Sequence, residues 1–252
     1  MFSDQSPAVQ EALVGSFVVF MMLSVGIDLT VERIKAVFKR PTILVSALGI
    51  NYVAVPLLFM ALIHLFDVEG MWAVGLMFVA VAPGGPVAGV LIQNAGGNLA
   101  LGVSLLVLMN LLNTFVTPLG ILATNAAASS ALPLSGMIKT IVLFQLLPLT
   151  AAMAFRHFQP TLAQRIQPTI ERLAKVVLFV VATAILASEI PRLLTLPLAL
   201  VAVCHLAVPI AIFAGWWLTP GTRRERIAVA IGAPYRSISV VLLLLAAWVR
   251  DM

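Results

Sequence analysis

Arg236 is the residue in this sequence with the clearest chemical potential, because it interrupts the apolar stretch 227–249 directly after Gly232-Ala233-Pro234-Tyr235. A charge at the centre of a membrane span costs at least ~2.5–3.5 kcal/mol on insertion scales, so it normally faces a cavity or a partner. A guanidinium has a fork of donors suited to a carboxylate and stays charged at physiological pH. Arg236 is therefore predicted to bind an organic anion. The alternative is that it pairs with backbone carbonyls and only holds the fold.

Three asparagines lie inside other apolar stretches and are candidates for the same site: Asn51, Asn110 and Asn113. Asn110 and Asn113 lie within one turn of each other on the fourth stretch, where such side chains either contact a ligand or hydrogen-bond neighbouring helices, and the sequence leaves both interpretations open for them. Two glycine- and proline-rich interruptions complete the candidate substrate-binding set: Pro83, Gly84 and Gly85 in the first, and Pro234, Tyr235 and Ser237 beside Arg236 in the second.

Both interruptions are expected to break a helix. The run Ala82-Pro83-Gly84-Gly85-Pro86 cannot continue an ordinary helix, because proline removes a donor and clashes with the preceding turn. Pro234 has the same effect at a similar depth in its own stretch, although a simple kink is the alternative there. Two broken helices in one bundle are typical of secondary transporters.

Other kinds of chemistry find little support in the sequence. His64, His157 and His205 are scattered without metal-ligand spacing, and Cys204 is the single cysteine. There is no Gly-x-Ser-x-Gly motif and no pair of carboxylates within an apolar stretch. We therefore expect no metal site, no cofactor and no enzymatic activity, and an intramembrane enzyme is the weaker alternative.

The elements that must position these residues are membrane helices. The chain of 252 residues is 62% hydrophobic and 10% charged, and its mean hydropathy is +1.10. Apolar stretches long enough to cross a ~30 Å hydrocarbon layer recur along it. Because these stretches are continuous and not alternating, the fold class is predicted to be all-α. The eight predicted spans are 9–27, 41–66, 70–95, 99–124, 136–155, 173–190, 196–218 and 227–249.

The basic residues predict the orientation of these spans. Most of the 15 lysines and arginines fall in the loops after the first, fifth and seventh spans, which the positive-inside rule assigns to the cytoplasm. Both termini are then expected outside the cytoplasm, in a bacterial plasma membrane. The net charge of +5 is explained by topology and not by nucleic-acid binding, and the lipid bilayer is the expected partner. The oligomeric state is not determined by the sequence.

The positions of the two breaks indicate an inverted repeat. Residues 1–252 are predicted to form a single transmembrane domain with one repeat at about 9–124 and a second at about 136–249. The breaks fall in spans 3 and 8, which correspond only when one helix is added before the first span and one after the last. The architecture then looks like ten helices without the first and the last.

Three segments resemble the bile acid:sodium symporter family: MMLSVGIDLTVERIKAVFKRP at 21–41, APGGPVAGVLIQNAGGNLALGV at 82–103 and AIGAPYRSISVVLLLLA at 230–246. The resemblance implies a membrane transporter in which the second and third segments form crossing helices. It also implies sodium-binding side chains at positions that are here Ala88, Gly89, Gly102, Leu106, Ala230 and Pro234. Asn51 stands where the family usually has Gln. The chain therefore resembles a divergent, bacterial-type member that lacks the sodium-ligand motifs.

The function expected from these features is secondary transport of a small organic anion, without sodium coupling through the family's usual sites. A truncated or non-transporting membrane protein of the same fold is the main alternative. An arsenite exporter of related fold is a further one, although Cys204 lies in span 7 and not near the first break.

Overall fold

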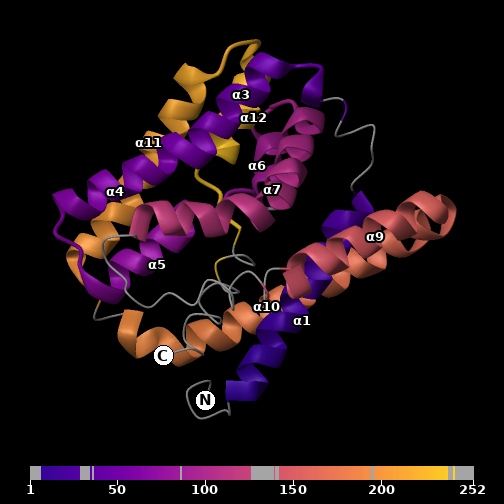
Figure 1. Cartoon of the computed structure of the whole chain (residues 1–252), viewed down its shortest axis with the longest axis horizontal. Helices are drawn as coiled ribbons and strands as arrows, with labels where there is room; N and C mark the ends of the chain where they lie inside the picture. The colour runs from indigo at the N-terminus through magenta and orange to yellow at the C-terminus, as the bar shows by residue number, and fades with distance from the viewer. Residues whose placement is uncertain are drawn as a thin grey trace. The chain divides into compact units, whose positions relative to one another are not determined.

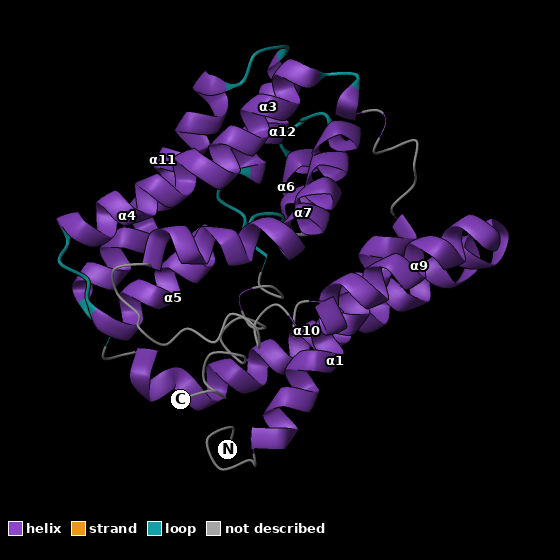
Figure 2. Ribbon diagram, viewed as in Figure 1, coloured by secondary structure: helices purple, strands orange, loops and turns teal. Residues whose placement is uncertain are grey.

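The computed structural model describes residues 7–28, 35, 37–85, 87–125, 139, 142–193, 196–237 and 241. Throughout these ranges the regular structure is helical and contains no strand, as Figure 2 shows. The prediction of an all-α fold is confirmed for this part of the chain. The helices, in chain order, are α1 (Pro7–Asp28), α3 (Pro41–Gly49), η1 (Ile50–Ala54), α4 (Val55–Leu65), α5 (Gly70–Ala80), α6 (Val87–Asn94), α7 (Leu99–Asn125), η2 (Val142–Leu146), α9 (Leu147–Phe158), α10 (Pro160–Leu193), α11 (Leu198–Leu218) and α12 (Arg223–Gly232).

The chain forms two compact units, and each draws on both predicted repeats (Figure 1). Unit 1 comprises 1–30, 133–196 and 242–252, and unit 2 comprises 31–132 and 197–241. Among the described helices, unit 1 holds α1, η2, α9 and α10, and unit 2 holds the others. The single-domain organisation and the inverted repeat remain predictions.

Unit 1 is built on the packing of α1 against α9 and α10. Gly26 of α1 lies so close to α9 that an added Cβ would stand 2.6 Å from the Leu149 carbonyl oxygen. Ile27, Ala152 and Ala163 form the buried apolar cluster at this contact. Helix α10 begins at Pro160, well before the predicted span start at 173. Proline suits the first turn of a helix, and Ile166 and Ile170 pack against the cluster, so the helix starts early.

Unit 2 contains both predicted breaks. The third span is interrupted between α5, which ends at Ala80, and α6, which begins at Val87. Helix α12 ends at Gly232, and an irregular segment runs through Arg236. The remainder of the predicted eighth span, apart from residue 241, lies outside the described residues. Both sequence interruptions therefore end helices at the expected places.

In the described part of unit 2, two helical segments are long and apolar enough to cross a membrane: Pro41–Leu65, with a mean hydropathy of 2.1, and Leu198–Leu218, with 2.3. The segments Gly15–Ile27, Gly70–Ala80, Leu99–Asn113 and Val142–Phe158 are shorter apolar helices. Many large apolar side chains on these helices are exposed, for example Val45 at 69% and Phe213 at 63%. Exposure of this kind is expected where lipid, not water, surrounds the helix.

The segment Pro41–Leu65 changes from α-helix to π-helix at Ile50–Ala54 and then returns to α-helix. The change is explained by Pro56, which has no N–H to donate to the preceding turn. The Val55 N–H donates to the Ile50 carbonyl, five residues back, instead of to Asn51. The bulge therefore leaves the Asn51 carbonyl without its usual helical donor.

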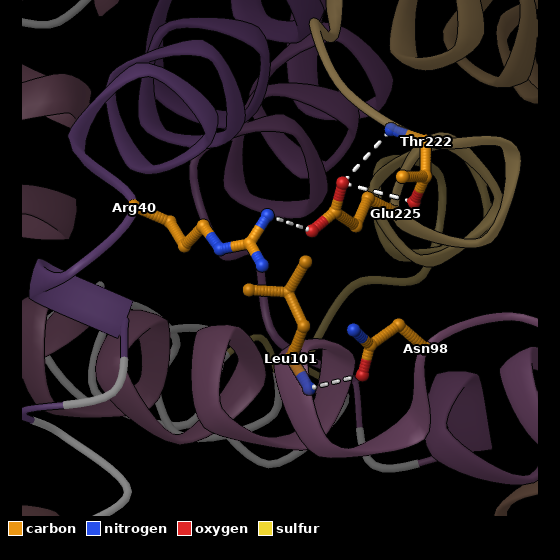
Figure 3. A network of polar contacts seen from close by, with 5 residues as sticks. All are labelled: Arg40, Asn98, Leu101, Thr222 and Glu225. Carbon is orange, nitrogen blue, oxygen red and sulfur yellow. Dashed lines mark hydrogen bonds and ion pairs between the residues drawn. The ribbon is translucent and has the colours of Figure 1, made fainter.

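A polar network at the start of α12 ties three parts of unit 2 together (Figure 3). Arg40 pairs with Glu225, and the other Glu225 oxygen accepts hydrogen bonds from the Thr222 backbone N–H at 2.8 Å and hydroxyl at 2.9 Å. The Asn98 N–H donates to the Arg224 carbonyl at 2.8 Å, and the Asn98 side chain accepts from the Leu101 N–H at 3.1 Å. The starts of α3, α7 and α12 are thus held side by side.

Candidate functional site

The two broken segments lie against each other inside unit 2. Pro83 and Arg236 form an antiparallel bridge. The Gly85 N–H donates to the Tyr235 carbonyl at 3.0 Å, and the Ser237 N–H donates to the Ala82 carbonyl at 2.7 Å. These bonds satisfy backbone groups that the helix breaks leave unpaired and that lipid could not satisfy. Two segments about 150 residues apart in the sequence thereby become one crossing region.

The crossing region requires glycine at two positions. Gly84 has a φ of +96°, a conformation that residues with a Cβ rarely adopt. An added Cβ on Gly85 would stand 2.5 Å from the Arg236 carbonyl oxygen, which is backbone and cannot rotate away. Gly84 and Gly85 are therefore explained by close backbone packing at the crossing.

A polar stripe along α7 supports the first break. Asn110 donates to the Gly84 carbonyl at 2.8 Å, Asn113 donates to the Pro83 carbonyl at 2.6 Å, and Thr117 donates to the Val81 carbonyl at 2.9 Å. All three side chains are at least 96% buried. The spacing of three and four residues places them on one face of the helix. Asn110 and Asn113 were identified from sequence, whereas Thr117, which continues their spacing, was missed.

Arg236 lies at the centre of the crossing region. Its Nη1 donates to the Asn51 side-chain oxygen at 2.9 Å and to the Ala233 carbonyl at 3.3 Å. Its Nη2 donates to the Asn51 carbonyl at 3.1 Å and also to the Ala80 carbonyl. Within the described ranges no carboxylate pairs with the guanidinium, and its buried Nε has no hydrogen-bond partner. The four terminal donors are therefore held by protein oxygens.

Asn51 is placed for this role by the π-helix. The bulge frees the Asn51 carbonyl, which then accepts from Arg236. The Asn51 amide nitrogen donates to the Ala47 carbonyl at 2.9 Å, and this bond turns the amide oxygen toward the guanidinium. Asn51 thus offers two acceptors to one arginine across 185 residues of sequence.

Tyr52 was not identified from sequence, although it joins η1 to α7. Its hydroxyl lies 2.8 Å from the Asn113 side-chain oxygen and 3.0 Å from the Met109 carbonyl. Tyr52 therefore orients the side chain of Asn113, which donates to the Pro83 carbonyl, from a second helix. The only available signal was its position next to Asn51.

The other predicted residues also fall in or beside the crossing region. The Ser237 hydroxyl is buried and lies 3.5 Å from the Asn110 side-chain oxygen. Tyr235 is half-buried and packs against an apolar cluster, and Pro234 lies next to it in the chain. The ten predicted residues therefore all lie in four places: the two broken segments, the π-helix η1 and the helix α7.

The apolar cluster beside the crossing bears on sodium binding. Its buried members are Ala88, Ile92, Leu106 and Ala228. Ala88 and Leu106 occupy two of the positions at which the family resemblance implies sodium-binding side chains. Ala230 occupies another and lies against Gly215, where an added Cβ would meet the Ala230 Cα at 2.5 Å. Methyl groups and methylenes offer no oxygen ligand, so the side chains at these positions do not fit a sodium ion.

A small cavity lies between α3, η1, α7 and α12, with Asn51 as its polar lining residue and apolar neighbours such as Leu106, Met109 and Val229. Its volume of about 10 Å³ is close to the least that holds one water molecule. It is too small for an organic anion. Among the described residues, no group of three or more His, Cys, Asp or Glu side chains is arranged to hold a metal ion.

Comparison with known proteins identifies the family. The profile of the Sodium Bile acid symporter family matches residues 16–196, which is most of the chain. The chain belongs to this family. The matched range includes the resembling segments 21–41 and 82–103, whereas the segment 230–246 lies outside it. The family is one of integral membrane transporters.

Related proteins include plant proteins described as probable chloroplastic sodium/metabolite cotransporters. BASS3 of Oryza sativa subsp. japonica is 25% identical over 217 residues, which cover 81% of this chain and 49% of that protein. BASS1 of the same plant is 31% identical over 100 residues, 40% of this chain and 25% of that protein. BASS1 of Arabidopsis thaliana is 24% identical over 153 residues, 61% of this chain and 38% of that protein. The chain spans at most about half the length of these relatives.

Proposed function

We propose that this protein is a secondary transporter that carries a small organic anion across a membrane without sodium at the family's usual sites. Membership of the family and the cotransporter names of its relatives support transport. The observation that carries the proposal is the crossing region, in which two broken segments pair around one half-buried arginine. Substrate sites of many transporters lie at such discontinuous helices near the bilayer midplane.

Two features of the crossing favour an anionic substrate. The helix α6 starts at Val87, directly after the first break, and the N-terminal end of a helix carries a partial positive charge of roughly half a unit. Arg236 adds a full positive charge, and its buried Nε–H has no partner in the described part of the chain. Because the other guanidinium donors are held by the protein, Arg236 acts on the anion through its charge and through Nε. Asn110, Asn113 and Ser237 line the same region.

Independence from sodium is supported by the apolar cluster. Sodium, like other hard cations, requires several oxygen ligands. Ala88, Leu106 and Ala230 supply no oxygen ligand through their side chains. Ala88 and Leu106 are buried in the same apolar cluster. We also propose a bacterial plasma membrane with both termini outside the cytoplasm, an orientation that the distribution of basic residues supports.

The proposal is tested by uptake of labelled small mono- and dicarboxylates into proteoliposomes, with sodium outside in one set and choline in the other. Wild-type uptake is expected to be saturable and unchanged when choline replaces sodium. Arg236→Gln is expected to reduce uptake at least about tenfold, which corresponds to the loss of one charge-assisted contact of about 1.5–3 kcal/mol. Arg223→Gln, at an exposed arginine on α12, is the matched control and is expected to transport like wild type.

Uptake that survives Arg236→Gln would refute the anion role of Arg236. A strict requirement for sodium would refute the cation independence, and uptake of an organic cation in place of the carboxylates would refute the substrate class. Each variant is first checked for wild-type elution on size exclusion, so that a loss of uptake reports on function and not on folding.

A second candidate is a non-transporting membrane protein of the same fold. It is favoured by one observation: four protein oxygens already hold the terminal donors of Arg236, as a purely structural clamp would require. This candidate predicts no carboxylate uptake by wild type, together with a loss of thermal stability in Arg236→Gln.

A further inference from the structure

Four oxygens surround the guanidinium of Arg236, and we refer to them as the oxygen cage: the Asn51 side-chain oxygen and the carbonyls of Asn51, Ala80 and Ala233. Three of the four are backbone carbonyls released from helical hydrogen bonding. Ala80 is the last residue of α5, Ala233 is the C-cap of α12, and Asn51 lies in the π-helix whose bonding skips its carbonyl.

The cage has the electrostatic character of a cation site. The C-terminal end of a helix carries roughly half a negative charge, and α5 and α12 both end at the guanidinium. Two such ends together provide about one negative charge without any carboxylate. Unwound carbonyls and the C-terminal ends of half-helices are the groups with which transporters coordinate alkali ions. Rings of carbonyls also replace the hydration shell of a permeating ion in channels.

We propose that the oxygen cage is a monovalent-cation site that the protein fills with its own side chain. The guanidinium of Arg236 is a tethered cation that balances the two helix ends, so neither the fold nor the crossing region depends on an alkali ion. The inference rests on the proposed function only where it concerns transport without sodium. Occupation of the cage itself is a property of the folded protein.

The placement of the neighbouring groups agrees with a permanent occupant. In the described part of unit 2, Glu225 pairs with Arg40 at the start of α12 and not with the guanidinium of Arg236. Tyr52, whose neighbour supplies two of the four cage oxygens, directs its hydroxyl to Asn113 and Met109 instead. The cage oxygens therefore meet one cation, and that cation is covalently attached.

The test is rescue of Arg236→Ala by small solutes, measured as the thermal unfolding midpoint of the purified protein in detergent. Guanidinium at low millimolar concentration, well below denaturing levels, is expected to raise the midpoint of this variant by about 3–6 °C when it reaches ten times its dissociation constant. Urea is the matched neutral solute, because it has similar size, planarity and N–H groups, and it is expected to have no effect. Wild type and Arg223→Ala are expected to respond to neither solute.

In a second series, sodium or potassium chloride replaces choline chloride at constant ionic strength. The wild-type midpoint is expected to stay constant, because its cage is filled, whereas the alanine variant is expected to gain stability with at least one of the small cations. Arg236→Lys serves where the alanine variant fails to fold. It keeps the charge, so it is expected to fold, to be more stable than Arg236→Gln and to ignore guanidinium.

Three outcomes would overturn the inference. The first is a guanidinium response in Arg236→Ala no larger than that of wild type, and the second is equal rescue by urea. The third is a lysine variant that is no more stable than the glutamine variant, which would show that the cage does not require positive charge. None of these measurements involves uptake, so a failure of the transport proposal leaves them interpretable, and their failure leaves the uptake experiment unaffected.

Discussion

The hydrogen bonds between Asn51 and Arg236 predict a measurable coupling between two residues that are 185 positions apart in the sequence. Asn51→Ala removes the side-chain acceptor of Nη1 and also the bond from the Asn51 amide to the Ala47 carbonyl. A hydrogen bond to a charged group contributes about 1.5–3 kcal/mol, and a neutral one contributes about 0.5–1.5 kcal/mol. The substitution is therefore expected to destabilise the protein by about 2–4 kcal/mol.

The assay is a double-mutant cycle on unfolding midpoints in detergent. For a chain of this size, about 2–4 kcal/mol corresponds to a fall in midpoint of at least roughly 4 °C. In the Arg236→Ala background, Asn51→Ala should cost less, because the bond to the guanidinium is already gone. The expected coupling energy between the two positions is about 1.5–3 kcal/mol.

The matched control is Asn98→Ala, which removes a cap on α7 and makes no contact with Arg236. Its effect is expected to add to that of Arg236→Ala within about 0.5 kcal/mol, as is usual for independent sites. A coupling energy for Asn51 and Arg236 as small as that of this control would refute the geometry of the crossing region.

Two further predictions concern the close packing at the crossing and the network at the start of α12. Gly85→Ala is expected to destabilise by about 1–3 kcal/mol, because the new methyl meets the Arg236 carbonyl, and Gly75→Ala, where an added Cβ meets nothing within 4 Å, should be close to neutral in the same thermal assay. Hydrogen bonds from Thr222, backbone first, together with Arg40, hold the pKa of Glu225 below its ordinary value of 4.5. A depressed carboxyl pKa gives stability that is complete above the unfolded pKa and is lost as the pH falls through the folded pKa. The thermal unfolding midpoint should therefore fall when the pH is lowered below about 4.5. Glu225→Gln should flatten that acid limb, and an unchanged limb would contradict the role of the network.

The sequence predicted local features of the crossing region better than the contacts within it. The Pro-Gly-Gly-Pro run indicates a broken helix because proline and glycine act on their own backbone, and α5 and α6 are indeed separate. The pairing of Gly85 with Tyr235 depends on how distant segments pack, and no local pattern encodes it. The same limit left Arg236 with two interpretations, anion binding or carbonyl pairing. The carbonyl contacts are now visible, and the anion role remains a proposal.

Helix boundaries show a related limit. Residues 160–172 are polar enough to be left out of the apolar span 173–190, yet α10 includes them. The apolar side chains Ile166 and Ile170 pack on unit 1, and this tertiary contact extends the helix beyond the hydropathy signal. Thr117 and Tyr52 were missed for a similar reason, since a single hydroxyl inside an apolar helix has significance only when its acceptor is known.

The π-helix at Ile50–Ala54 also constrains how this chain tolerates insertions and deletions. A π-helical turn holds about one residue more than an α-helical turn, so it is equivalent to a single insertion carried within a continuous helix. Removal of one residue there would let the helix run on without a gap while rotating everything on one side by about 100°. Asn51 would then face a different neighbour, although no contact residue had been replaced. A related chain that lacks one residue near Pro56 would therefore present a different neighbour to Arg236, even if all its other residues were the same.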